Sequence, residues 1–189
     1  MNTIIYMVRH AKSPFLLGQE KTRGLSEDGF TDTTKVTAIM QSEPVDLIVS
    51  SPYTRAIQTI EQIAHIKNKE IKRYEGLKER KLKGEFRLTE SEILQAIQMS
   101  FDDIDFRLQD GESIRDVQNR AIPIIKMLLH EYSGKNIVIG THGNVMTIIL
   151  NYFNPSYGYE FWKNTSKPDI YKLEFSNEKL CSVERLWAQ

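Results

Sequence analysis

IIYMVRHAKS, residues 4–13, places an apolar run directly before an arginine and a histidine. An uninterrupted apolar run of this length is typical of a strand buried on both faces, as in a parallel sheet. Burying Arg9 or His10 costs free energy unless the group is paired. We therefore expect residues 3–9 to form a strand whose end carries functional groups to the edge of a sheet.

Two further apolar segments end in a similar way. Residues 45–51, VDLIVSS, lead into PYTRA with Arg55, and residues 135–141, KNIVIGT, lead into His142. Ligands bind at the carboxyl ends of the strands in parallel sheets. We therefore expect one pocket at this edge, containing Arg9, His10, Arg55 and His142 with the hydroxyl groups of Ser13, Ser50, Ser51 and Thr141.

Segments with helical periodicity alternate with the strands. Helices are expected over residues 26–43, 54–68, 89–101, 113–132 and 144–153, and further strands over 70–74, 169–175 and 181–187. In the first helix, Ser26 is the expected N-cap, and Phe30, Val36 and Ile39 are expected to face inward. This alternation predicts an α/β fold, a three-layer α/β/α sandwich with a mostly parallel central sheet. With 189 residues and no linker, we expect a single domain over 1–189, with a small substrate-cap insertion around 75–110.

The composition argues against several classes of partner. The chain has 25 lysines and arginines and 25 aspartates and glutamates, so its formal net charge is zero. It therefore has no net positive charge to attract nucleic acid or an anionic membrane. The sequence has no basic leader followed by an apolar stretch, no window long enough to span a membrane, and a single cysteine, Cys181. These features predict a cytoplasmic protein with no nucleic-acid partner and no membrane partner.

A metal centre is not expected either. HxH and HExxH spacings are missing from the sequence, and arginines beside a ligating histidine would repel a divalent cation. We therefore expect no metal and no cofactor.

The pocket predicted at the strand ends suits phosphoryl chemistry. Two guanidinium groups fit a dianionic phosphoryl group, and backbone N–H groups at the start of the helix after His142, including that of Gly143, add anion binding. Neighbouring arginine charges disfavour imidazolium, so a histidine here can be neutral and attack phosphorus. For Arg55 the alternative is a surface ion pair with Glu61 or Asp46.

A leaving alkoxide needs a proton, and residues 75–110 are the natural source of an acid. Glu79 is the first candidate. Glu75, Glu85, Glu112 and Asp102 stay open at this point.

The motifs VRHAKS, LSEDG, SSPYTRAIQT, LKER, DGESI and GTHGNV resemble, in order and spacing, those of the histidine phosphatase superfamily, which has the phosphoglycerate mutase-like fold. The resemblance implies that His10 is phosphorylated during turnover and that Arg9 and Arg55 bind the phosphoryl group. It further implies that His142 stabilises that group and that Glu79 is the proton donor. Ser13 and Gly143 complete the phosphate-binding set that we expect.

The chain also departs from that family. Ala11 replaces the commoner glycine, Leu16 stands where the family often has an asparagine, and RKLKGEFR after Glu79 lacks a tryptophan-glutamate-glycine signature. The chain is shorter than typical glycolytic mutases and lacks their asparagine-rich entry loop. We therefore predict the phosphatase branch: a metal-independent phosphomonoester hydrolase that acts on a small-molecule phosphate ester through a phosphohistidine. A phosphoprotein substrate stays open, and the alternatives are a phosphoglycerate-type mutase and a catalytically idle phospholigand-binding protein.

Overall fold

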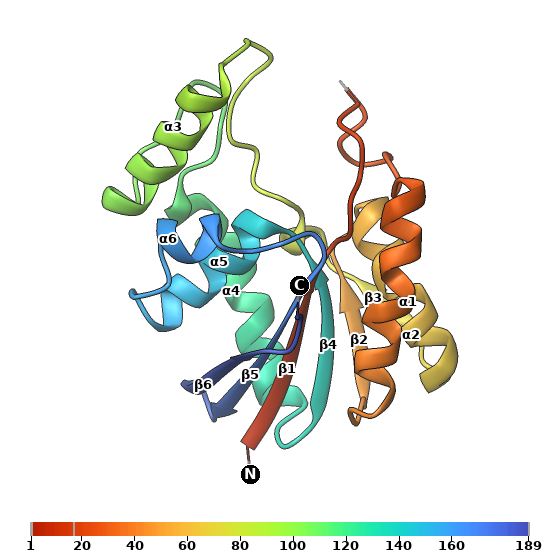
Figure 1. The fold of residues 1–189 in the computed structure, drawn as a ribbon. Helices are drawn as coiled ribbons and strands as arrows, with labels where there is room; N and C mark the ends of the chain where they lie inside the picture. The colour runs from red at the N-terminus through yellow and green to blue at the C-terminus, as the bar shows by residue number, and fades with distance from the viewer. Residues whose placement is uncertain (1, 17, 189) are drawn as a thin grey trace.

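A six-stranded sheet forms the centre of the molecule. The computed structural model describes residues 2–16 and 18–188, and its strands follow the order β3-β2-β4-β1-β5-β6 (Figure 1). Four neighbouring strands run parallel to one another: β3 (Ile71–Arg73), β2 (Leu47–Ser50), β4 (Asn136–Thr141) and β1 (Asn2–Arg9). Next to β1 the sheet continues with β5 (Asp169–Ser176) and then β6 (Lys179–Arg185), each antiparallel to the strand before it. The mostly parallel sheet predicted from the sequence is confirmed.

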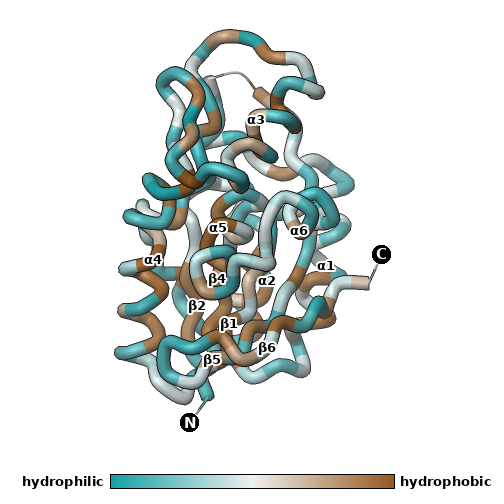
Figure 2. Tube along the Cα trace, turned by 90° about the vertical axis from the view of Figure 1, so that its left-hand side faces the viewer, coloured by the Kyte–Doolittle hydropathy of each residue, from teal (hydrophilic) through white to brown (hydrophobic). Residues whose placement is uncertain are grey.

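Helices cover both faces of this sheet, as Figure 1 shows. On one side lie α1 (Glu27–Gln41) and α2 (Thr54–Lys67), and on the other lie α4 (Ile114–Glu131), which continues through Pro123, and α5 (Gly143–Phe153). Alternate residues of β1 enter the two cores: Ile5 packs with α4 and α5, whereas Tyr6 packs with α1 and α2. Each central strand is thus buried on both faces, and Figure 2 shows the hydrophobic residues gathered along these strands and α5.

The inward face of α1 differs from the prediction. Val36 is fully buried and Ile39 packs against the core, but Phe30 is 48% exposed, so its predicted inward position is wrong. The buried side of α1 begins instead at Gly29, because a Cβ atom there would lie 2.2 Å from the carbonyl oxygen of Lys12. This close approach rotates Phe30 outward and packs the start of α1 against the loop that follows β1.

The segment after β3 leaves the sheet and passes beyond the carboxyl ends of the parallel strands. It contains the short 3-10 helix η1 (Glu75–Leu77) and α3 (Glu90–Asp102), and α3 contacts α6 (Tyr159–Lys163) (Figure 1). The short helix α6 was not predicted. Residues 75–110 thus lie on the side where the strand ends are, which is the position that a substrate cap requires. Among the described helices, none is long and apolar enough to cross a bilayer.

Candidate active site

The strand register brings the predicted pocket residues together at one edge. Arg9 at the end of β1 lies beside Thr141 at the end of β4, and Ser50 of β2 lies beside Gly140 of β4. The parallel pairing continues one residue further, because the His10 N–H donates to the Thr141 carbonyl at 3.0 Å. The three turns that follow β1, β2 and β4 therefore start at one level.

The ring of His10 is held in a defined tautomer. Its Nδ1 lies 2.7 Å from the carbonyl oxygen of Ala11, and a carbonyl can only accept, so Nδ1 carries the proton of the neutral ring. The lone pair is then on Nε2, which has no hydrogen-bond partner among the described residues. Burial lowers the pKa of His10 well below its ordinary value, and the charges of Arg55 and Arg9 lower it further. The ring is thus neutral, and the lone pair of its Nε2 is unoccupied.

His142 lies beside His10 and is fully buried. The two ring centroids are 5.2 Å apart, and Nε2 of His142 is 2.8 Å from the hydroxyl oxygen of Ser51. Burial lowers the pKa of His142 well below its ordinary value, and the charges of neighbouring cations add to that effect. Nδ1 of His142 is buried and has no partner within the described residues. Two neutral imidazoles therefore share the site.

The guanidinium of Arg9 packs directly on the start of α5. A Cβ atom at Gly143 would lie 2.7 Å from both Cζ and Nη2 of Arg9, so a glycine is needed there. Nη1 of Arg9 donates to the hydroxyl of Thr165, while its Nε is buried without a partner among the described residues. Arg9 is 8% exposed, and burial lowers the pKa of its guanidinium. The ordinary pKa of arginine is so high that the group keeps its positive charge.

Arg55 is buried, 1% exposed, and approaches the same site from the first turn of α2. Its Cζ lies 5.0 Å from the ring centroid of Tyr53, whose ring in turn packs on His142. Nη2 is 3.0 Å from a carboxylate oxygen of Glu20, and Nη1 donates to the Glu20 carbonyl at 2.5 Å. The alternative of a surface ion pair with Glu61 or Asp46 is therefore wrong, because the partner of Arg55 is Glu20.

Glu79 contacts the N-terminus of α5. Its Oε1 accepts from the N–H groups of Val145 at 3.1 Å and Arg80 at 2.8 Å, and its Oε2 accepts from the N–H of Asn144 at 3.3 Å. The negative charge of Glu79 also acts on Arg9. These bonds orient the carboxyl group at the end of the helix. Oε2 accepts the single, longer bond and keeps a free lone pair.

The four competing carboxylates lie in other surroundings. Glu75, Glu85 and Asp102 are exposed. Glu112 binds Arg120 through both of its oxygens, at 2.7 and 2.9 Å. Burial raises the pKa of Glu112, but the bonds from Arg120 and the Lys81 N–H outweigh it and lower the pKa overall. Glu112 is thus a structural anion.

Ser13 has a different environment from the one expected. Its hydroxyl donates to the Gly24 carbonyl at 2.6 Å and accepts from Nη1 of Arg23 at 2.7 Å. Ser13 therefore stabilises the loop after β1 and positions the guanidinium of Arg23. The charge of Arg23 lowers the pKa values of Arg55 and His142. Sequence reasoning missed Arg23, because it lies in a loop without periodic pattern.

Thr59 was also missed. Its Oγ1 accepts from the N–H of Ala11 at 3.0 Å and donates to the carbonyl of Arg55 at 2.7 Å. It thereby holds Ala11, the residue whose carbonyl orients His10. Its position one helical turn after Arg55 is the one signal in the sequence that pointed to it.

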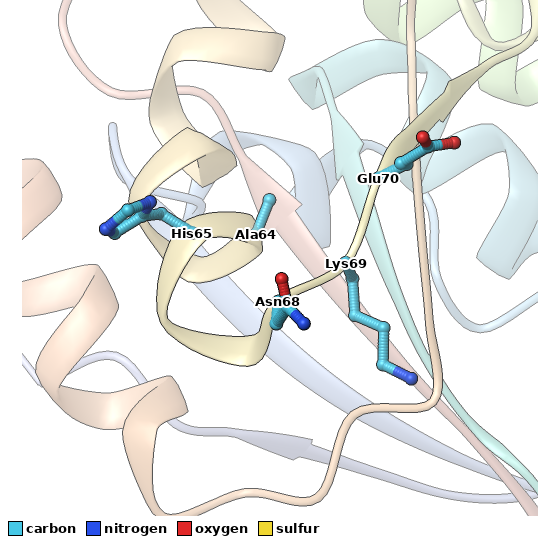
Figure 3. A pocket seen from close by; sticks show the side chains of 5 residues that line it. All are labelled: Ala64, His65, Asn68, Lys69 and Glu70. Carbon is cyan, nitrogen blue, oxygen red and sulfur yellow. The ribbon is translucent and has the colours of Figure 1, made fainter.

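A hollow at the end of α2 that is far from Arg55 contains none of the predicted site residues. Figure 3 shows its lining of Ala64, His65, Asn68, Lys69 and Glu70, with the side chains of His65 and Glu70 directed apart. Within the described residues, no group of three or more His, Cys, Asp or Glu side chains is placed to hold a metal ion.

Comparisons with known proteins show the family and the fold of this chain. The model of the histidine phosphatase superfamily (branch 1) matches residues 5–187. No curated protein sequence matches the chain. Among solved structures, mycobacterial glucosyl-3-phosphoglycerate phosphatase is similar with 18% identity and a TM-score of 0.76, the alignment covering 98% of this chain and 97% of that one.

Two further structures share the fold. Bacillus stearothermophilus YhfR has 22% identity, a TM-score of 0.76, and coverage of 95% and 94%. A phosphoglycerate mutase from Bacillus anthracis has 15% identity, a TM-score of 0.74, and coverage of 97% and 92%. The mycobacterial phosphatase has also been solved with inorganic phosphate and with VO3. These neighbours have the phosphoglycerate mutase-like fold that the sequence predicted.

Proposed function

Because this chain belongs to the histidine phosphatase superfamily (branch 1), we propose that it is a metal-independent phosphomonoester hydrolase with His10 as its nucleophile. The observation that carries the proposal is the bond from Nδ1 of His10 to the Ala11 carbonyl, which leaves the lone pair on Nε2 beside Arg9 and Arg55. A neutral, oriented imidazole among fixed cations is suited to attack a phosphorus atom.

The first step transfers the phosphoryl group to the protein. Nε2 of His10 forms a bond to phosphorus as the bond from phosphorus to the ester oxygen breaks. Arg9 and Arg55 offset the charge on the non-bridging oxygens. Glu79, as the carboxylic acid, donates its proton to the leaving oxygen so that an alcohol departs.

The second step returns the site to its starting state. A water molecule attacks phosphorus, and the bond to Nε2 of His10 breaks. Glu79, now a carboxylate, accepts the proton of that water, and inorganic phosphate leaves with the electron pair restored to the ring nitrogen. His142, neutral and linked to Ser51, contacts the phosphoryl group in both steps.

The decisive experiment is rapid acid-free quenching of a reaction with phosphorus-labelled nitrophenyl phosphate. We expect an acid-labile, base-stable label on His10 and none in His10→Ala, which should also lose turnover. Arg55→Ala should weaken the binding of phosphate and vanadate together. Turnover by the wild type with no label on the protein would refute the proposed nucleophile, and loss of activity in chelator would refute metal independence.

The role of Glu79 has its own test. Glu79→Gln should slow esters with poor leaving groups far more than nitrophenyl phosphate, whose leaving group needs little protonation. Glu75→Gln is the matched control, because this exposed carboxylate lies four residues earlier and outside the contacts with α5. Equal losses on both esters in Glu79→Gln would mean that another group is the acid.

The mutase alternative makes a different prediction. A mutase returns the phosphoryl group to the same skeleton, so it releases little free phosphate and needs a bisphosphate primer. We expect stoichiometric phosphate release without a primer. An idle binding protein would show neither reaction.

A further inference from the structure

A cavity of about 470 Å³ opens beside Arg9, and its lining includes none of His10, Arg55, Glu79 and His142. Besides Arg9, its lining consists of Lys12, Leu94, Trp162, Lys163, Thr165 and Lys167. These residues come from the loop after β1, from α3, from α6 and from the segment before β5. The cavity therefore lies between the sheet edge and the segment proposed as the cap.

The lining of this cavity is strongly cationic. Four of its seven residues are lysine or arginine and none is a carboxylate, although the whole chain has 25 cations and 25 anions. Lys163 and Lys167 form no ion pair with any described carboxylate, and the pair of Lys12 with Asp28, at 3.5 Å, joins two exposed groups. The positive charge is thus local and largely uncompensated.

The excess of positive charge acts on Lys167. Its side chain reaches solvent, yet the protein atoms around its ammonium group lower its pKa, and the charges of Arg9 and Arg23 lower it further. An anion between these groups would relieve their repulsion. The lining also contains an apolar side chain, Leu94, and an indole, Trp162, whose Nε1 is buried without a partner among the described residues.

Arg9 joins the cavity to the reaction centre. It packs on Gly143 at the start of α5 and donates to Thr165 in the cavity wall. A phosphoryl group bound by Arg9 would therefore leave the organic part of the ester with room to extend toward Lys163 and Lys167.

We propose that Lys163 and Lys167 form a subsite for a second anionic group on the substrate. The substrate class is then phosphomonoesters whose short organic part carries a carboxylate or a second phosphoryl group. Lysines act as point charges and do not impose the planar geometry of arginine, so both anions share the same chemistry here. This inference rests on the proposed phosphatase function and names the substrates of that same site.

The test compares matched esters. Glycerol 3-phosphate and 3-phosphoglycerate differ in one carboxylate, and fructose 6-phosphate and fructose 1,6-bisphosphate differ in one phosphoryl group. In at least one pair, we expect the wild-type kcat/KM to be about tenfold or more higher for the ester with the additional anionic group. The reason is that a hydrogen bond between charged groups contributes about 1.5–3 kcal/mol. The pair that shows the preference identifies the anion.

The preference should depend on the two lysines. In the double variant Lys163→Gln and Lys167→Gln, the ratio of kcat/KM within that pair should fall about tenfold. Lys35→Gln removes an equal charge from an exposed position of α1 and should keep the wild-type ratio. Single variants of Lys163 and Lys167 give the same comparison if the double variant unfolds.

The outcomes separate the two proposals. Two results would overturn the subsite: the wild type hydrolyses the esters without preferring those with the additional anionic group, or the preference persists in the double variant. If no ester is hydrolysed, the proposed phosphatase function fails instead. The subsite is then judged by calorimetry with the phosphonate analogues of the same pairs, for which tighter binding of the charged member supports it and equal binding overturns it.

Discussion

Acidification should destabilise this protein through its two buried histidines. Burial lowers the pKa values of His10 and His142 well below the ordinary value of about 6.5. Below that value the unfolded chain takes up protons at these rings while the folded protein does not. The stability is therefore fully present above the unfolded pKa and is lost as the pH falls from 6.5 toward the folded pKa values.

The size of the effect follows from the unfolded state. A histidine of pKa 6.5 that stays neutral in the folded protein costs about 0.2 kcal/mol of stability at pH 7.0 and about 1.4 kcal/mol at pH 5.5. The difference is about 1.2 kcal/mol for each ring. His10 and His142 together should lower the free energy of unfolding by about 2.5 kcal/mol between these two pH values.

Urea unfolding at pH 7.0 and 5.5 measures this difference. The wild type should lose about 2.5 kcal/mol more on acidification than the double variant His10→Gln and His142→Gln, and each single variant should recover about half of that amount. Any constant change in stability that a substitution causes cancels, because only the pH-dependent part is compared. Equal pH dependence in the wild type and the double variant would show that the two rings titrate in the folded protein as they do in the unfolded chain, and would refute the lowered pKa values of His10 and His142.

Three substitutions test the supports of the site. Gly143→Ala places a methyl group 2.7 Å from the Arg9 guanidinium, so the equilibrium dissociation constant for phosphate should rise about tenfold, and an unchanged constant would show that Arg9 does not bind it. Arg120→Gln removes the donors to the carbonyl groups of residues 76, 78 and 79, so kcat for poor leaving groups should fall about tenfold with little change in KM if Arg120 positions Glu79. Thr59→Val keeps the side-chain shape but removes both buried hydrogen bonds of the hydroxyl, at about 1 kcal/mol each, so kcat should fall several-fold while the protein stays folded and melts about 4–8 °C lower. A loss in Thr59→Val that tracks stability alone would contradict its positioning role.

The strand ends could be predicted because two simple rules combine. Apolar runs buried on both faces identify the parallel strands, and parallel strands share the edge at which they end. Arg9 is the last residue of its strand, and His10 and His142 follow theirs immediately, so their meeting could be predicted without knowledge of the loops. Arg55 needed one step more, since it lies in the first turn of the helix after β2.

The same reasoning failed where packing between distant loops decides the outcome. Phe30 occupies an apolar position of an amphipathic helix, but the contact of Gly29 with the Lys12 backbone turns it outward. Arg23 and Glu20 reach the site because the loop after β1 folds back onto α2. Neither position carries a periodic signal, and charged residues in a loop are most often solvated. Their roles depend on tertiary contacts that no local pattern encodes.

Among the described residues, four of the seven buried side-chain atoms without a hydrogen-bond partner belong to residues of the proposed phosphate site. Arg9 Nε, Arg55 Nε, Thr141 Oγ1 and His142 Nδ1 are all buried without a partner among those residues, and each such atom costs about 1–3 kcal/mol. A fold selected for stability alone would pair them, as β1 and β4 pair their backbone groups a few ångströms away. The same burial that keeps the two imidazoles neutral also removes water from the two guanidinium groups, which strengthens their attraction for a dianion. The proposed nucleophile and the guanidinium groups proposed to bind phosphate therefore depend on one property, the exclusion of water from the strand ends. A substitution that admits water there should weaken both together.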